Sequence, residues 1–176
     1  MESAPSEPHR LFDDSLLRIF PKPIREPRRA WLAIPLAYVL SIGGSLLLAS
    51  LVQNIGPALE TPKFPMQGGT ALFALVVFAP VVETFIMAGF ITLFRMVMRD
   101  DLAVLASAIG WGVAHSLEAA AWGLTIWWPF LIFSTLYVVW RQRSFGTAIV
   151  VVAATHGLQN LVPALTVAYP GLLPGL

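Results

Sequence analysis

Long apolar runs separated by short polar segments dominate the chain. They cover roughly residues 31–52, 70–98, 102–122, 124–140 and 145–168. A helix that crosses a membrane needs about 20 mainly apolar residues, and these runs approach or exceed that length. The pattern therefore predicts an all-α fold, a polytopic membrane bundle of about five transmembrane helices. Pro80 should bend or unwind the second helix, because proline removes a backbone donor.

The segment before the first apolar run has a different character. Residues 1–30 are polar and rich in proline and arginine. Among them Phe12, Leu16, Ile19 and Phe20 stand at helical spacing, which predicts a short amphipathic helix on the inner membrane surface. An unstructured tail is the alternative. The expected organisation is an N-terminal cytoplasmic segment 1–30, a helix bundle 31–168 and a short C-terminal tail 169–176.

The composition is that of a membrane protein. The chain of 176 residues is 57% hydrophobic and 12% charged, whereas soluble domains are about 25% charged. We therefore expect an integral membrane protein, with the bacterial inner membrane as its location. Cysteine is absent, which excludes disulfides, zinc–thiolate sites and thiol nucleophiles.

Lysine and arginine are distributed unevenly between the loops. With five spans, every basic residue except Lys63 falls on one side of the membrane. The positive-inside rule makes that side cytoplasmic, so the N-terminus is expected in the cytoplasm. The basic N-terminal segment should contact anionic lipid. Because the basic residues lie close to the membrane, we expect no nucleic-acid partner.

Once the loops and the ends of the runs are set aside, four acidic or histidine residues remain at membrane depth: Glu83, His115, Glu118 and His156. A charge at this depth costs several kcal/mol, so we expect it to have a partner or a function. At a rise of about 1.5 Å per helical residue, Glu83, His115 and His156 lie about 18, 21 and 20 Å from the cytoplasmic edge. This shared depth predicts a cluster around a water-accessible cavity. Asn160 shares a helix face with His156, whereas Glu118 lies nearer the outer side and is expected to be structural.

Small residues recur every four positions along the predicted helix that carries His115. Ala106, Gly110 and Ala114 form this stripe. Small side chains let neighbouring membrane helices approach closely. The stripe therefore predicts a close helix contact along this face.

Three short motifs contain the membrane-depth residues. They are "APVVETFIMAGF" at 79–90, "WGVAHS" at 111–116 and "THGLQN" at 155–160. In order and placement they resemble the CPBP (also called ABI) intramembrane proteases, which include the type II CAAX prenyl proteases. The chain departs from the family pattern at Thr84 and Ala88, where the family has a second Glu and an Arg, and at Trp111, where it has a Phe. Losing Glu and Arg together avoids an uncompensated buried charge.

The resemblance implies a catalytic role for each of four residues. Glu83 and His115 would activate a water molecule, and His156 and Asn160 would hold the developing oxyanion. The implied function is an intramembrane endopeptidase that cleaves a peptide or protein entering from the membrane or its cytoplasmic edge. Peptide hydrolysis needs these elements: an activated water, a proton donor and charge stabilisation.

A metal site is an open alternative. Glu83, His115 and His156 match a catalytic zinc site with an open fourth position. We favour a metal-free reaction with no cofactor, because Asn160 beside His156 suits an oxyanion better than a zinc shell.

Three other functions stay open. One is a catalytically inactive, CPBP-like membrane binding protein or bacteriocin-immunity protein. Another is a purely structural subunit, which leaves the shared depth unexplained. The last is a proton-coupled transporter or channel, since Glu and His at mid-membrane also form proton relays. The chain lacks the inverted repeat that many transporters show.

Overall fold

The computed structural model describes residues 11–56, 59–60 and 62–172, and these residues form helices and loops without a β-strand. Residues 1–10 of the predicted N-terminal segment and 173–176 of the predicted tail lie outside the described residues. The main elements are α2 (Ala30–Ile55), α3 (Gly68–Phe73), the π-helical turn η2 (Ala74–Phe78), α4 (Ala79–Phe94), α5 (Asp100–Glu118), α6 (Ala120–Trp140) and α7 (Phe145–Ala168). Two short helices precede them: η1 (Leu16–Ile19) and α1 (Lys22–Arg25). The all-α prediction is confirmed.

Four helices are long and apolar enough to cross a membrane by length and composition. They are Ala30–Ile55, Gly68–Phe94, Ala120–Trp140 and Phe145–Ala168. The second of these is continuous through α3, η2 and α4. Helix α5 has 19 residues and begins with two aspartates, Asp100 and Asp101. The predicted five spans are thus reduced to four candidates, and α5 as a fifth stays a prediction.

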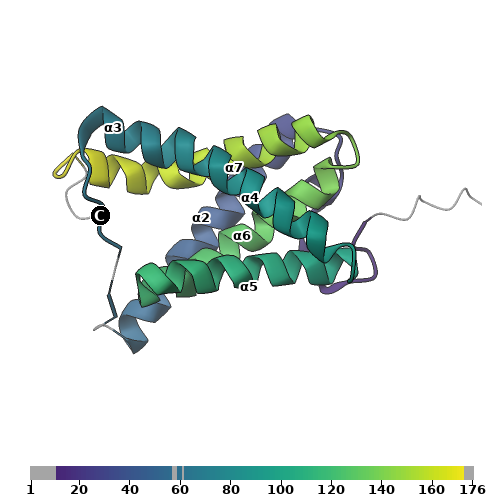
Figure 1. Cartoon of the computed structure of the whole chain (residues 1–176), viewed down its shortest axis with the longest axis horizontal. Helices are drawn as coiled ribbons and strands as arrows, with labels where there is room; N and C mark the ends of the chain where they lie inside the picture. The colour runs from purple at the N-terminus through teal and green to yellow at the C-terminus, as the bar shows by residue number, and fades with distance from the viewer. Residues whose placement is uncertain (1–10, 57–58, 61, 173–176) are drawn as a thin grey trace, which may run out of the picture.

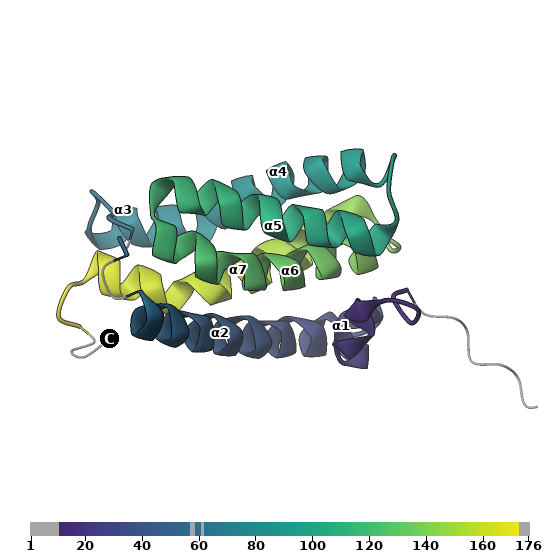
Figure 2. The ribbon, with the colours of Figure 1, turned by 90° about the horizontal axis from the view of Figure 1, so that it is seen from below.

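The helices pack in three layers (Figures 1 and 2). Helix α2 lies on one side, α6 and α7 form the middle, and α4 and α5 lie on the other side. The core runs along α6, where every residue from Pro129 to Trp140 is buried. Three polar contacts join α2 to the middle layer. Trp128 Nε1 donates to the Leu40 carbonyl at 2.9 Å, Ser41 Oγ donates to Gln159 Oε1 at 2.6 Å, and Gln159 Nε2 donates to Ser45 Oγ at 3.4 Å.

The N-terminal segment packs against the bundle, but the four apolar residues predicted to share one face of an amphipathic helix do not share one. Phe12 and Phe20 are buried, whereas Leu16 and Ile19 are 84% and 82% exposed and Leu17 between them is buried. The cause is local: Phe12 adopts a left-handed backbone (φ 74°) and the next helix, η1, is a single 3₁₀ turn. A continuous α-helical face therefore does not describe this segment, and its place on the membrane surface stays a prediction.

The closest approach of α5 to α6 is made by glycines outside the predicted small-residue stripe. A Cβ on Gly123 would lie 2.2 Å from the Gly112 carbonyl oxygen and 1.8 Å from Ser116 Oγ. By contrast, a Cβ on Gly110 would have no atom within 4 Å. The stripe prediction is therefore wrong at Gly110. Together with Ala106 and Ala114, Gly110 lines an open apolar groove between α4 and α5.

Candidate functional site

The site begins with the irregular turn in the second span. Pro80 has no N–H, so the carbonyl of Val76 loses its α-helical donor. The preceding turn, η2, is wound as a π-helix, a form that is common at functional sites. The Val76 carbonyl oxygen faces α7, where a Cβ on Gly157 would lie only 2.6 Å away. The expected disturbance at Pro80 is thus a widened turn, and Gly157 lets α7 approach it.

Asn160 meets the same turn one helical turn further along α7. Its side-chain nitrogen donates to the Leu75 carbonyl at 3.0 Å. An Asn amide nitrogen carries two N–H donors, so this bond occupies one of them. The bond fixes the direction of the amide, which is half-buried.

Glu83 and His156 meet across the contact between α4 and α7. Glu83 Oε2 lies 3.6 Å from His156 Nε2, with the two side chains 25% and 5% exposed. Glu83 belongs to the candidate span Gly68–Phe94, and His156 belongs to the candidate span Phe145–Ala168. The predicted convergence of a carboxylate and an imidazole from separate helices is therefore present in the structure.

His115 is held on α5 by its own helix and by aromatic rings. Its Nδ1 lies 2.9 Å from the Trp111 carbonyl. Because a carbonyl only accepts, Nδ1 must be the donor, which leaves Nε2 of a neutral ring as an acceptor. The imidazole ring packs edge-on against Trp122, with the centroids 4.4 Å apart.

Phe130 on α6 connects the two histidines. Its ring centroid lies 5.7 Å from that of His115 and 5.4 Å from that of His156. The ring also stacks on Trp111 at 4.3 Å, while Phe133 stacks on His156 at 4.6 Å. The two imidazoles therefore border one aromatic cluster.

The positions that differ from the family pattern lie on the buried face of α4. Thr84 and Ala88 are 1% and 2% exposed. The Thr84 hydroxyl donates to the Pro80 carbonyl at 2.6 Å, within its own helix. Both residues are neutral, so neither leaves a buried charge without a partner.

Glu118 is the last residue of α5 and is exposed. It lies three residues after His115 and is close enough to act on that imidazole electrostatically. The structure thus brings Glu83 and His156 together, borders them with His115 and fixes Asn160 on η2. The structural role expected of Glu118 stays a prediction.

A zinc site would place strict geometric demands on Glu83, His115 and His156. Zinc ligands lie about 2.0–2.2 Å from the metal, so three donors must surround one point. Within the described ranges, no group of three or more His, Cys, Asp or Glu side chains is placed to hold a metal ion. As arranged, Glu83, His115 and His156 do not fit a zinc centre, and no step below uses one.

Sequence reasoning missed the aromatic part of the site. Phe130 and Phe133 lie in a helix in which every residue from Pro129 to Trp140 is buried, so nothing in the sequence distinguishes them from their neighbours. Trp122 had a weak signal, as a tryptophan at the start of an apolar run. It contacts both His115 and Phe64, with the Phe64 ring centroid 5.7 Å away.

Comparison of the chain with family models, with curated proteins and with solved structures finds no match.

Proposed function

We propose that the chain is an intramembrane endopeptidase of the CPBP type, which hydrolyses a peptide bond with water activated by Glu83. The observation that carries the proposal is the 3.6 Å approach of Glu83 Oε2 to His156 Nε2. The two residues come from helices that are long and apolar enough to span a membrane. A carboxylate in such a place is costly, and intramembrane ionisable residues typically mark functional sites. The three ordered sequence motifs support the same family.

In this reaction Glu83 accepts a proton from water as the water oxygen attacks the carbonyl carbon of the substrate. The oxyanion that forms accepts hydrogen bonds from His156 and from the second N–H of Asn160. The bond from Asn160 to the Leu75 carbonyl supports this role, because it orients the amide before substrate arrives. His115 shares the water with Glu83, and the proton passes to the leaving amine as the C–N bond breaks.

The decisive experiment compares two neighbouring substitutions on α4. Wild type, Glu83→Gln and Thr84→Ala are reconstituted in liposomes with detergent-extracted membrane proteins, and new peptide ends are counted by mass spectrometry. Glu83→Gln should lower cleavage by about 10²–10⁴-fold, because the general base is lost. Thr84→Ala removes a hydroxyl bonded within its own helix and should change cleavage less than about threefold. Full cleavage by Glu83→Gln would end the protease proposal.

A zinc-dependent reaction needs its own test. For zinc to bind, Glu83, His115 and His156 would have to surround one point, and the described residues hold no such group of donors. We expect cleavage to continue in excess chelator. Loss of cleavage in chelator and recovery with Zn²⁺ would show a metalloprotease.

A binding function is the second candidate, and the position of His115 favours it. His115, one half of the proposed water-activating pair with Glu83, contacts the carbonyl of its own helix and the rings of Trp122 and Phe130. A CPBP-like binding or immunity protein would not need that pair to assemble. Such a protein would retain full cellular function with Glu83→Gln. The variant would also copurify with the same partner as wild type, and mass spectrometry would find no new peptide ends.

We propose further that α5 is a fifth span, that the N-terminus is cytoplasmic and that the protein resides in a bacterial inner membrane. Helix α5 runs beside the candidate spans (Figure 2), and Arg143 Nε donates to the Pro27 carbonyl at 2.7 Å, so these two basic segments share one end. The cysteine-free chain allows single-cysteine tests. In intact cells an impermeant maleimide should label Lys63→Cys and not Gln142→Cys; the reverse would invert the topology.

A further inference from the structure

One end of the bundle carries α1, the α4–α5 loop and the α6–α7 loop (Figure 2). The basic side chains at this end include a group in the α4–α5 loop and a group before α2. They differ in how many carboxylates accompany the cations. This difference in local charge is what distinguishes their possible ligands.

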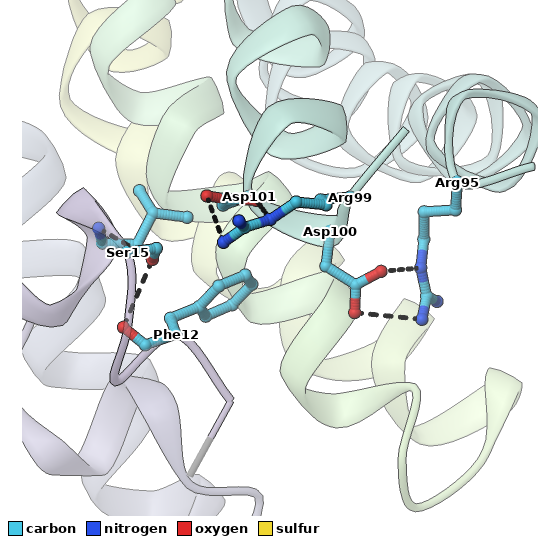
Figure 3. A network of polar contacts seen from close by, with 7 residues as sticks. Phe12, Ser15, Arg95, Arg99, Asp100 and Asp101 are labelled. Atoms are coloured by element: carbon cyan, nitrogen blue, oxygen red, sulfur yellow. Dashed lines mark hydrogen bonds and ion pairs between the residues drawn. The ribbon is translucent and has the colours of Figure 1, made fainter. Parts of the chain in front are cut away.

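The basic residues of the α4–α5 loop are each matched with an acid (Figure 3). Arg95 makes two contacts to Asp100, at 2.7 and 3.2 Å. Arg99 makes two contacts to Asp101, at 3.3 and 3.4 Å. The charges of these two pairs cancel, so the loop offers little attraction to an anion.

The group before α2 has an excess of positive charge around a small cavity. The cavity has a volume of about 230 Å³ and is lined by Lys22, Pro23, Glu26, Arg28, Arg29 and Leu32. Three cations thus face one carboxylate. Arg28 Nε lies 3.8 Å from Glu26 Oε2, a weak contact for an arginine that is 73% exposed.

The cavity lies at the N-terminal end of a candidate membrane span. Ala30 begins that span, and Leu32, two residues later, forms part of the cavity wall. The neighbouring Trp31 is 71% exposed, and tryptophan is enriched at membrane interfaces. The cavity therefore combines cationic side chains with apolar ones at the start of a candidate span.

We propose that this cavity binds the phosphate group of an anionic membrane phospholipid. Lys22, Arg28 and Arg29 supply the positive charge and the N–H donors, while Pro23 and Leu32 contact the apolar part of the lipid nearest the headgroup. A lipid fits better than free phosphate, because free phosphate would gain nothing from the apolar wall. The paired loop at Arg95 and Arg99 does not bind an anion. The site is independent of peptide hydrolysis.

Two triple variants with the same change in net charge test the proposal. One is Lys22→Gln/Arg28→Gln/Arg29→Gln in the cavity. The other is Arg18→Gln/Arg95→Gln/Arg99→Gln, which alters basic residues of the same end outside it. Each protein is placed in nanodiscs with equal amounts of phosphatidylglycerol and phosphatidylcholine, and the lipids retained are counted by native mass spectrometry. We expect the preference for phosphatidylglycerol to fall at least about tenfold in the cavity variant and less than about twofold in the other.

Equal losses in the two variants, or no loss in either, would overturn a discrete site and leave only diffuse attraction. Inorganic phosphate added to nanodiscs of phosphatidylcholine alone distinguishes the two sources of phosphate. If it raises the unfolding temperature of wild type as much as phosphatidylglycerol does, and does not raise that of the cavity variant, the ligand is free phosphate and the lipid proposal is wrong. If the triple variant does not fold, Lys22→Gln replaces it, with an expected loss of about fivefold.

Discussion

Two helix contacts in the bundle rely on glycine, and they serve different purposes. Between α5 and α6, Gly123 sits against the Gly112 carbonyl and Ser116. Between η2 and α7, Gly157 sits against the Val76 carbonyl. Helices α5 and α6 are joined through the single residue Ala119, whereas η2 and α7 are far apart in sequence. The first contact therefore closes a hairpin, and the second brings distant segments together.

The polar groups of the candidate site lie near the second contact, between η2 and α7. Beside Gly157 lie the Asn160–Leu75 hydrogen bond and the Glu83–His156 pair. Beside Gly123 lies His115, which contacts aromatic rings and the carbonyl of its own helix. The comparison suggests that the α5–α6 contact mainly supports the fold, while the η2–α7 contact sets the distance on which the proposed chemistry depends.

The largest effect on stability is expected for Gly123→Ala. The new Cβ would lie 1.8 Å from Ser116 Oγ and 2.2 Å from a backbone oxygen, so α5 and α6 must separate. The free energy of unfolding should fall by about 3 kcal/mol or more, measured by reversible denaturant unfolding in detergent. Gly110→Ala, where no atom lies within 4 Å, is the control and should raise it by up to about 1 kcal/mol. Equal values for the two variants would contradict the close approach.

Gly157→Ala should destabilise less but damage the site more. Its Cβ would lie 2.6 Å from the Val76 oxygen, which predicts a loss of about 1–3 kcal/mol. Moving α7 outward also lengthens the 3.6 Å Glu83–His156 approach. A displacement of about 1 Å can reduce catalysis about 10²-fold, so cleavage per folded molecule should fall sharply.

The control for Gly157→Ala lies on the same helix. Gly146→Ala meets no atom within 4 Å, so it should leave cleavage unchanged and, like Gly110→Ala, raise the free energy of unfolding by up to about 1 kcal/mol. If folded Gly157→Ala cleaves as well as Gly146→Ala, the distance between η2 and α7 does not control the reaction.

Most of the fold could be predicted from the sequence, because the long helices coincide with long apolar runs. The predicted run 145–168 coincides with α7, and the run 124–140 with most of α6. The shared depth of Glu83 and His156 correctly predicted their approach. These features depend on length and rise per residue, which the sequence determines directly.

The features that could not be predicted depend on exceptions to helical geometry. The π turn at η2 directs the Leu75 carbonyl to Asn160, and Pro80 alone did not specify its form. The 3₁₀ turn η1 buries Leu17 in place of Leu16. The aromatic contacts of Phe130 with both histidines arise from packing, which an apolar sequence does not encode by position.

A smaller effect is expected where α7 contacts α2 on its other side. Ser41 Oγ lies 2.6 Å from Gln159 Oε1, and the Gln159 side chain is buried. Side-chain hydrogen bonds between membrane helices contribute about 0.6 kcal/mol on average and at most about 1.7 kcal/mol. Gln159→Leu should therefore lower the free energy of unfolding by about 0.6–1.7 kcal/mol. The exposed Gln53→Leu on α2 is the matched control. A loss above about 3 kcal/mol would mean that α2 also positions the site helix.

The smallest effect on stability is expected in the loop between α4 and α5. Arg95 Nε and Asp100 Oδ1 are 2.7 Å apart, with side chains 37% and 29% exposed. Ion pairs this accessible contribute about 0.2–1 kcal/mol, and salt weakens them. A double-mutant cycle of Arg95→Gln and Asp100→Asn, measured by unfolding at low and high salt, should give a coupling in that range which shrinks with salt. A coupling free energy above about 2 kcal/mol that does not change with salt would contradict this expectation. It would mean that the loop couples the α5–α6 contact to the η2–α7 contact. In that case Gly123→Ala should impair cleavage as strongly as Gly157→Ala.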